Sequence, residues 1–369
     1  MKALVLCAGR GTRLRPLTHT RAKAALPVAG RPVLAHILSY LKEQGFRQVG
    51  VVVSPGQGEL RRLCPPTSGL SVSFIVQKHP RGIADAVAVA RRFVGDEPFL
   101  LYLGDNLTNE DLTPARERFE ASGAAALIAV RAVPDPRHFG VAVLDGDRVT
   151  RVVEKPDVPI SNLAIAGIYF FGPEVHQAIA GLKPSARGEL EITDAIAALL
   201  AQQRIVLAHQ LFGWWQDMGS PEGMLAANRH ILEGLERNLS PDLQTDRVTI
   251  AGPVAVGSGV RMEQVQLTGP LVIGRGAVLR NCCIGPFTSI GDGAVIENAT
   301  IENSILLAGC QLIGPLFHLN GCLLGRGVVI EAMVGPFDGF LVGDHGHLRL
   351  PAAGGGPCAK DDGAAPERR

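Results

Sequence analysis

Residues 4–27 have the sequence LVLCAGRGTRLRPLTHTRAKAALP, which decides how the N-terminal half of the chain is interpreted. The segment opens with a short apolar run, typical of a buried strand. A turn rich in small residues follows, from Ala8 through Gly9 and Gly11 to Thr12. Because small residues let the backbone approach a ligand closely, the N–H groups of such a turn can point at anionic oxygens. The segment therefore predicts a strand that leads into an anion-binding loop.

Two basic side chains accompany this loop, Arg13 and Lys23. An arginine guanidinium can contact two phosphate oxygens at once, whereas a lysine ammonium acts as a compact point charge. A strand followed by a phosphate-binding turn and two cations predicts a nucleoside triphosphate site. The segment lacks the Lys-Ser or Lys-Thr of a P-loop and the third glycine of a dinucleotide-binding fingerprint.

From residue 1 to about residue 235, apolar runs typical of strands alternate with segments of helical periodicity. The predicted strands are residues 2–7, 49–53, 72–76, 99–103, 126–131, 141–144, 149–154 and 165–171. The predicted helices are residues 33–41, which end before Gly45, and residues 83–93, 191–202 and 221–235. This alternation predicts an α/β fold, with a Rossmann-like, mixed but mostly parallel sheet and helices on both faces. The closer strands after Ala124 predict an antiparallel part, with a hairpin turn at residues 145–147.

The sequence pattern changes near residue 240. From residue 250 to about residue 330, aliphatic residues recur every six positions. The clearest register is Ile284, Ile290 and Ile296. A six-residue period predicts a parallel β-helix whose coils bury their aliphatic side chains in a shared prism. The repeat resembles the left-handed hexapeptide helix, and we expect an irregular coil at residues 316–321. We predict an α/β domain over residues 1–238, the β-helix over 239–348, and a disordered tail over 349–369.

The composition narrows the function classes. The chain has 369 residues, of which 46% are hydrophobic and 19% charged, which is enough for one large or two medium domains with real cores. A formal net charge of +1 argues against a broad nucleic-acid-binding surface. Seven cysteines without C-x-x-C spacing indicate free thiols. No signal peptide or long apolar run is present, so we expect a cytoplasmic protein without a membrane partner.

The whole opening pattern, G-x-G-T-R-L-x-P-x-T followed by lysine and proline, resembles the first motif of the sugar-1-phosphate nucleotidyltransferases. The run R-G-E-x-E-I-T-D at residues 187–194 is most similar to the glucose-1-phosphate thymidylyltransferases, here in a long form with a C-terminal β-helix. The resemblance implies transfer from dTTP to glucose 1-phosphate, giving dTDP-glucose and pyrophosphate, with Mg²⁺ as cofactor. We also expect a homo-oligomer. The resemblance is close over residues 1–235 and looser over the hexapeptide region.

This reaction joins two anions, which sets what the site must contain. Two unit charges 4 Å apart repel by roughly 4 kcal/mol at an effective dielectric of about 20. Cations and a divalent metal are therefore needed, whereas a phosphate oxygen is already ionised and needs little activation. Arg13 and Lys23 supply the cations. Asp105, at the end of a predicted strand, and Asp217, which the resemblance implies as a second metal contact, are the predicted Mg²⁺ ligands.

The resemblance also implies which residues bind the sugar phosphate and the nucleotide. For the sugar phosphate these are Gly140, Glu154, Lys155 and Gly167, with Lys155 as a catalytic cation. For the nucleotide they are Ala8, Gly9, Gly11, Thr12, Gln77 and Gly82, the last two at the base. Asp85 departs from the glutamine or histidine common in the family, which leaves thymine recognition open.

Three alternatives stay open at this stage. UTP or another triphosphate could replace dTTP, or a different sugar phosphate could replace glucose 1-phosphate. The β-helix could carry an acyltransferase activity through His318, although no matching coenzyme A loop is recognisable. A non-catalytic subunit would be expected to lack Lys23 or Asp105, and both are present. The run Asp344-His345-Gly346-His347 resembles a metal cluster but has no fourth ligand nearby, so we assign no site to it.

Overall fold

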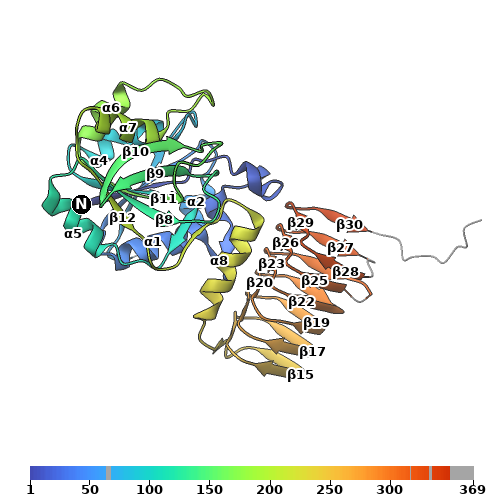
Figure 1. Cartoon of the computed structure of the whole chain (residues 1–369). Helices are drawn as coiled ribbons and strands as arrows, with labels where there is room; N and C mark the ends of the chain where they lie inside the picture. The colour runs from blue at the N-terminus through green and yellow to red at the C-terminus, as the bar shows by residue number, and fades with distance from the viewer. Residues whose placement is uncertain (64–67, 316, 332–334, 350–369) are drawn as a thin grey trace, which may run out of the picture.

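In a computed structural model, the described residues are 1–63, 68–315, 317–331 and 335–349. They form an α/β domain and a β-helix, which meet along helix α8 (Pro221–Glu233) (Figure 1). The predicted disordered tail lies outside the described residues, apart from Arg349 at the end of the last strand. None of the helices that the structure describes has the length and apolarity needed to cross a membrane.

A nine-stranded mixed sheet forms the centre of the α/β domain, in the order β5-β4-β1-β6-β11-β8-β12-β10-β9. Its strands are β1 (Lys2–Leu6), β4 (Gln48–Val53), β5 (Ser71–Val76), β6 (Phe99–Leu103), β8 (Ala126–Ala132), β9 (Gly140–Asp145), β10 (Arg148–Glu154), β11 (Leu163–Phe171) and β12 (Val206–Gln210). Strands β5, β4, β1 and β6 are parallel, whereas β11 is antiparallel to β6 and β8. The predicted mixed sheet is confirmed, including the hairpin between β9 and β10. Strand β12 was not predicted.

Helices cover both faces of this sheet, as predicted, because side chains alternate between two cores along each central strand. On β1, Ala3 and Val5 join one core, whereas Leu4 joins the other. The first core contains residues of α1 (Val33–Glu43), α5 (Thr113–Ser122) and α8. The second contains residues of α3 (Ile83–Val89), α4 (Arg91–Val94), α6 (Glu174–Ala180) and α7 (Ile192–Ala201). A further short helix is α2 (Glu59–Leu63).

The single helix predicted over residues 83–93 is wrong, because the chain forms two short helices that separate at Ala90. After the break, the ring of Phe93 packs over Gly50 of β4. A Cβ on Gly50 would lie only 2.7 Å from this ring. Packing against the sheet therefore outweighs the local preference for one continuous helix.

Short elements beyond the sheet edge shape the site. Strands β7 (Asn106–Thr108) and β13 (Trp215–Asp217) pair antiparallel, with Asp217 opposite Asn106. The 3₁₀ turns η1 (Thr12–Leu14), η2 (Leu17–His19) and η3 (Lys23–Ala25) follow β1, and a small hairpin of β2 (Pro27–Val28) and β3 (Arg31–Pro32) precedes α1. The pairing of β7 with β13 brings together two segments more than 100 residues apart in the chain.

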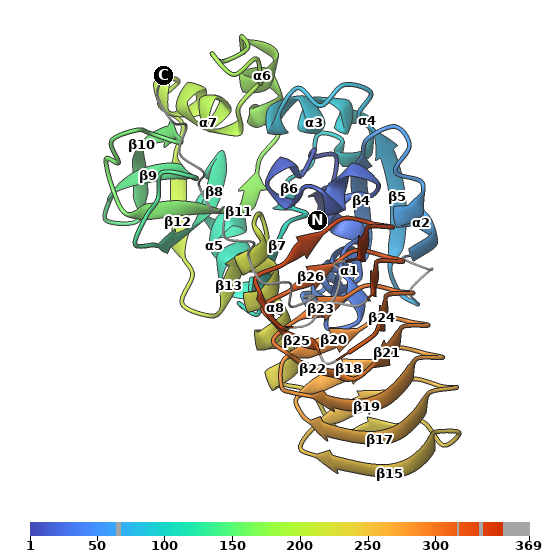
Figure 2. The same ribbon diagram turned by 90° about the vertical axis from the view of Figure 1, so that its right-hand side faces the viewer.

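The C-terminal part is a long stack of short parallel strands, which fits the predicted left-handed β-helix (Figure 2). Its strands are β14 (Asn238–Leu239), β15 (Gln244–Ala251), β16 (Val254–Val256), β17 (Arg261–Thr268), β18 (Leu271–Ile273), β19 (Val278–Ile284), β20 (Thr288–Ile290), β21 (Val295–Glu297), β22 (Ala299–Glu302), β23 (Ile305–Leu306), β24 (Gln311–Ile313), β25 (Phe317–Asn320), β26 (Leu323–Leu324), β27 (Val329–Glu331), β28 (Gly335–Asp338), β29 (Leu341–Val342) and β30 (His347–Arg349). The repeat isoleucines Ile284, Ile290 and Ile296 are at most 1% exposed and lie on three successive strands.

The irregular coil predicted at residues 316–321 is confirmed only in part. The regular repeat is interrupted by an insertion in this coil, but residues 317–320 form a regular strand, and Leu316 lies outside the described residues. Strand β25 stays in register with β22. Val295 pairs with Gln311, and Ala299 pairs with Phe317 in the next coil. The later coil therefore has two more residues between these paired positions than the earlier coil. The insertion falls between β24 and β25, and the ladder resumes after it.

The run at residues 344–347 lies at one corner of the β-helix, where each coil makes a turn. Gly276, Gly293, Gly309 and Gly327 turn successive coils there with φ between +62° and +71°, a conformation that glycine adopts readily. His345 continues this stack with φ of 58°. Within the described residues, no group of three or more histidine, cysteine, aspartate or glutamate side chains could hold a metal ion. The run is therefore the turn of a coil.

Asn228 of α8 joins the two parts of the chain. Its side chain is fully buried. Its Oδ1 accepts from the Ala29 N–H at 2.8 Å and from the Ser289 hydroxyl at 2.6 Å, and its Nδ2 donates to the Phe287 carbonyl at 2.8 Å. The Arg229 guanidinium lies 4.1 Å from the centroid of the Phe287 ring. These contacts hold the β-helix against the α/β domain at β20.

Candidate active site

The glycine-rich loop after β1 is held in a compact form by its own neighbours. Gly11 has a φ of 58°, and a Cβ there would lie 2.9 Å from the Thr18 methyl group. The Thr18 hydroxyl donates to the Gly11 carbonyl at 2.7 Å. The turns η1 and η3 then place Arg13 and Lys23 on the same loop. Glycine is needed at this position for both its backbone angle and its close packing.

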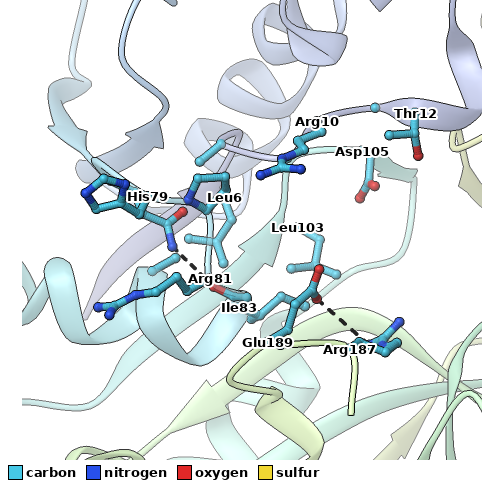
Figure 3. A pocket seen from close by; sticks show the side chains of 18 residues that line it. Leu6, Arg10, Thr12, His79, Arg81, Ile83, Leu103, Asp105, Arg187 and Glu189 are labelled. Atoms are coloured by element: carbon cyan, nitrogen blue, oxygen red, sulfur yellow. Dashed lines mark hydrogen bonds and ion pairs between the residues drawn. The ribbon is translucent and has the colours of Figure 1, made fainter. Parts of the chain in front are cut away.

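Two adjoining cavities open at the carboxyl ends of β1 and β6. The larger has a volume of about 710 Å³ and the smaller about 240 Å³, and both are lined by Gly9, Gly11, Thr12 and Asp105. Thr12 and Asp105 lie at one end of the larger cavity, and His79 and Arg81 lie at the other (Figure 3). The predicted residues Ala8, Gln77 and Gly82 line the larger cavity, and Arg13, Lys23 and Lys155 line the smaller one.

Asp105 lines the smaller cavity, whereas Asp217 lines neither cavity but pairs with Arg13, which lines the smaller one. Asp105 follows β6, Asp217 ends β13, and the Met218 N–H donates to the Asp105 carbonyl at 2.9 Å. Lys23 Nζ lies 2.6 Å from Asp105 Oδ2, and Arg13 Nη2 lies 3.4 Å from Asp217 Oδ2. The two predicted metal ligands and the two predicted cations therefore form one cluster.

The electrostatics of the two carboxyls differ. Burial opposes ionisation of Asp105, but the charge and hydrogen bond of Lys23 outweigh it, so the pKa of Asp105 is lowered. Burial, and then the charge of Asp105, raise the pKa of Asp217. Two carboxylates that repel each other in a partly dry site form a donor set that suits a hard divalent cation. Since Mg²⁺ usually retains several waters and takes further ligands from phosphates, two protein carboxylates are sufficient.

The predicted sugar-phosphate residues Gly140, Glu154 and Lys155 lie together on the β9–β10 hairpin, where Gly140 faces Glu154 across the two strands. A Cβ on Gly140 would lie 2.9 Å from the Thr193 methyl group, so the position favours glycine. Lys155 Nζ lies 3.5 Å from Glu154 Oε1. Lys155 also lines the smaller cavity, beside Lys23 and Asp105.

Gly167 lies apart from this group and lines neither of the two cavities. It has a φ of 75° and lies where the register of β11 shifts. A Cβ there would lie 2.5 Å from the Asn106 amide nitrogen, which donates to Asp105 Oδ1 at 3.1 Å. Gly167 thus makes room for the residue that supports Asp105.

Arg187 was not among the predicted site residues, yet it lines the larger cavity and pairs with three glutamates. Its Nη2 lies 2.7 Å from Glu191 Oε1, 3.1 Å from Glu154 Oε1 and 3.9 Å from Glu189 Oε2. Figure 3 shows it facing Glu189 along one wall. The signal in the sequence was the R-G-E-x-E run. The run could not reveal the partner Glu154, which comes from a different strand.

At the opposite end, Gln77 and Asp85 form a buried pair, 3% and 4% exposed. Gln77 Nε2 donates to Asp85 Oδ2 at 2.7 Å and to the Gly82 carbonyl at 3.3 Å. Arg81 donates to the other oxygen of Asp85 at 2.8 Å. Both N–H groups of the glutamine are thus engaged, so its Oε1 is the atom left to accept a hydrogen bond from a ligand.

The sequence pattern of the nucleotidyl transferase family matches residues 2–234. The chain is 40% identical over 356 residues to a glucose-1-phosphate thymidylyltransferase of Streptomyces antibioticus, covering 95% of this chain and 99% of that relative. It is 45% identical over 237 residues to the low-salt glycan biosynthesis nucleotidyltransferase Agl11 of Haloferax volcanii, covering 63% of this chain and 66% of that relative. A Bacillus anthracis protein of known structure, assigned as a glucose-1-phosphate thymidylyltransferase, superposes with a TM-score of 0.60 at 32% identity, covering 64% of this chain and 97% of that chain. The chain therefore belongs to the nucleotidyl transferase family, among the sugar-1-phosphate nucleotidyltransferases.

Proposed function

We propose that the protein transfers the thymidylyl group of dTTP to glucose 1-phosphate, giving dTDP-glucose and pyrophosphate, with Mg²⁺ as cofactor. The observation that carries the proposal is the convergence of Lys23, Arg13 and Asp105 at one cavity, with Asp217 paired to Arg13 beside it. That cavity adjoins a larger one with room for a nucleoside. The relative from Streptomyces antibioticus, which matches nearly the whole chain, carries the same activity in its name.

In this proposal a phosphate oxygen of the sugar phosphate forms a bond to the α-phosphorus of the triphosphate. The bond from that phosphorus to the oxygen bridging to the β-phosphate breaks, and pyrophosphate leaves with the bonding electrons. Arg13 and Lys23 bind the triphosphate oxygens and stabilise the negative charge that builds up on them. The pair with Asp105 keeps the Lys23 ammonium inside the cavity until a phosphate oxygen competes for it.

Asp105 and Asp217 are the residues that would hold Mg²⁺, which when bound neutralises phosphate charge and aligns the reacting groups. Lys155 binds the sugar phosphate, since its ammonium lines the same cavity as Lys23. Glu154 accepts from sugar hydroxyls, and Arg187 holds its carboxylate in place. Gly140 provides the close packing beside Glu154 and Thr193, and Gly167 leaves room for the Asn106 amide beside Asp105.

The base end favours a pyrimidine with an imide. Since Asp85 and the Gly82 carbonyl engage the amide nitrogen of Gln77, the glutamine presents an acceptor to the base. Thymine and uracil offer an N3–H donor, whereas cytosine offers an acceptor at N3. UTP carries the same imide edge as dTTP, so it is the second candidate for the nucleotide.

A matrix of pyrophosphate-release assays tests the proposal. The wild-type protein is given dTTP, UTP, CTP, ATP or GTP with glucose 1-phosphate, mannose 1-phosphate or N-acetylglucosamine 1-phosphate. We expect the highest kcat/KM with dTTP and glucose 1-phosphate, UTP next, and loss of activity with EDTA that Mg²⁺ restores. A preference for a purine or for another sugar phosphate would refute the assignment, as would the absence of turnover with every pair.

A further inference from the structure

The last coil of the β-helix lies against the loop that carries Arg13 and Lys23. In both ribbon views, β29 and the segment after it lie beside the N-terminal loop (Figures 1 and 2). A Cβ on Gly343 would lie 2.9 Å from the Cβ of Pro16. The fold thus brings the end of the β-helix into direct contact with the nucleotide-binding segment.

Asp344 makes the polar part of this contact. Its Oδ2 accepts from the Thr20 hydroxyl at 2.8 Å and lies 3.4 Å from Arg21 Nε. Its Oδ1 accepts from the Arg326 N–H at 2.8 Å, within the β-helix. The Asp344 side chain is 0% exposed and that of Arg21 is 9% exposed. Among the described residues, no other carboxylate forms an ion pair with Arg21, so Asp344 compensates a buried cation.

A second aspartate at the same corner shows what the turn itself requires. Asp292 accepts from the Arg275 N–H at 2.8 Å, as Asp344 accepts from that of Arg326. The Asp292 side chain is 48% exposed and pairs with the Arg275 guanidinium, within the β-helix. The geometry of the turn therefore accounts for the hydrogen bond from the Arg326 N–H to Asp344 Oδ1. It does not explain why Asp344 Oδ2 lies against Thr20 and Arg21.

Thr20 and Arg21 lie directly before the residues that carry the site. The next residue, Ala22, donates its N–H to Glu59 of α2 at 2.8 Å, and Lys23 follows. Thr18 holds the Gly11 carbonyl. The segment between Gly11 and Lys23 is therefore fixed by Glu59 at one point and by Asp344 at another.

We propose that Asp344 is a positioning residue for the nucleoside triphosphate, and that the last coil of the β-helix serves to order the nucleotide-binding loop. This inference rests on the proposed function for the identity of the ligand. The carboxylate holds Thr20 and Arg21, which fixes the backbone that presents Gly11 and Lys23 to the phosphates. Binding of the sugar phosphate, which depends on the β9–β10 hairpin, does not depend on this contact.

The test compares full-length Asp344→Asn with Asp292→Asn, which removes the same type of turn carboxylate away from the loop. The first measurement is hydrogen exchange of backbone amides in residues 11–23, without substrate. The second is the KM of the nucleoside triphosphate that the wild-type protein uses best. We expect faster exchange and a rise in this KM of about 3- to 30-fold for Asp344→Asn, with the KM of the sugar phosphate within twofold. Asp292→Asn should match the wild type in each.

Unchanged exchange in residues 11–23 would overturn the inference, as would faster exchange without a change in the triphosphate KM. An equal rise in both KM values would also overturn it, since that outcome indicates a general structural loss. If Asp344→Asn does not fold, Thr20→Val carries the test with the same expectations, because it removes only the 2.8 Å bond. The exchange measurement needs no turnover, so it separates a failure of this inference from a failure of the proposed function.

Discussion

The buried pair of Gln77 and Asp85 leads to a prediction about how the site selects its base. Asp85 accepts from the Gln77 amide nitrogen at 2.7 Å, which fixes the direction of the amide. Asp85→Asn keeps nearly the same shape, but its amide can present either an oxygen or an NH₂ group. The glutamine can then turn over and present donors to the pocket. We therefore expect the variant to discriminate less well between an imide and cytosine.

The size of the effect follows from the bond that fixes the amide. A hydrogen bond to a charged group contributes about 1.5–3 kcal/mol. The bond between Gln77 and Asp85 is short and buried, which places it within that class. Since about 1.4 kcal/mol corresponds to a factor of ten, the carboxylate favours one amide orientation by about 10- to 150-fold. Asp85→Asn removes most of this preference.

The assay is steady-state pyrophosphate release with glucose 1-phosphate and Mg²⁺, using dTTP, UTP and CTP in turn. The ratio of kcat/KM for dTTP to that for CTP should fall by about 10- to 150-fold in Asp85→Asn. The ratio for dTTP to UTP should stay within twofold, because both bases carry the same imide, and this ratio serves as the internal control. A variant that loses activity equally with all three nucleotides would show that Asp85 only supports the fold and would refute the reasoning.

Three further predictions concern catalysis, stability and thiol reactivity. Lys23→Ala should lower kcat by about 10²- to 10³-fold, measured by pyrophosphate release, and unchanged turnover would contradict its role. Asn228→Ala should lower the free energy of unfolding by about 3–5 kcal/mol in urea titrations, because the fully buried Asn228 side chain makes three hydrogen bonds that the variant loses. Burial raises the pKa of the Cys310 thiol to about 12, so iodoacetamide should alkylate the exposed Cys283 in the native protein well before Cys310, as peptide mapping would show. Equal labelling of the two cysteines would contradict the burial of Cys310.

The central sheet could be predicted because its strands are continuous apolar runs bounded by polar turns. Helix α5 was missed because most of its side chains are polar or charged, and only Ala115 and Phe119 are buried. Helix α6 is only 7 residues long. Strand β12 was also missed, and its place between β8 and β10 depends on pairing across the sheet. Elements that depend on neighbours distant in the chain give a weak local signal.

The same distinction applies to the site. The grouping of Arg13, Lys23 and Asp105 could be predicted because they lie in or directly after a strand and its loop. Asp217 could be predicted only from the motif around it, since its position beside Asp105 depends on the pairing of β7 with β13. The partners of Arg187 and Asp85 are side chains that only the folded chain brings together.

The contact of Asp344 with Thr20 joins residues 324 positions apart, and it depends on the number of coils between them. Helix α8 holds the β-helix at β20, and the stack continues through β23 and β26 to β29, which ends at Val342 shortly before Asp344. Neighbouring strands are about 4.8 Å apart, so these three steps carry the chain about 14 Å along the stack. One coil fewer or more would move the turn by about 4.8 Å, which exceeds the length of any hydrogen bond. The hexapeptide period predicts that such a turn exists, whereas the coil count and the attachment at Asn228 determine that it reaches the nucleotide-binding loop.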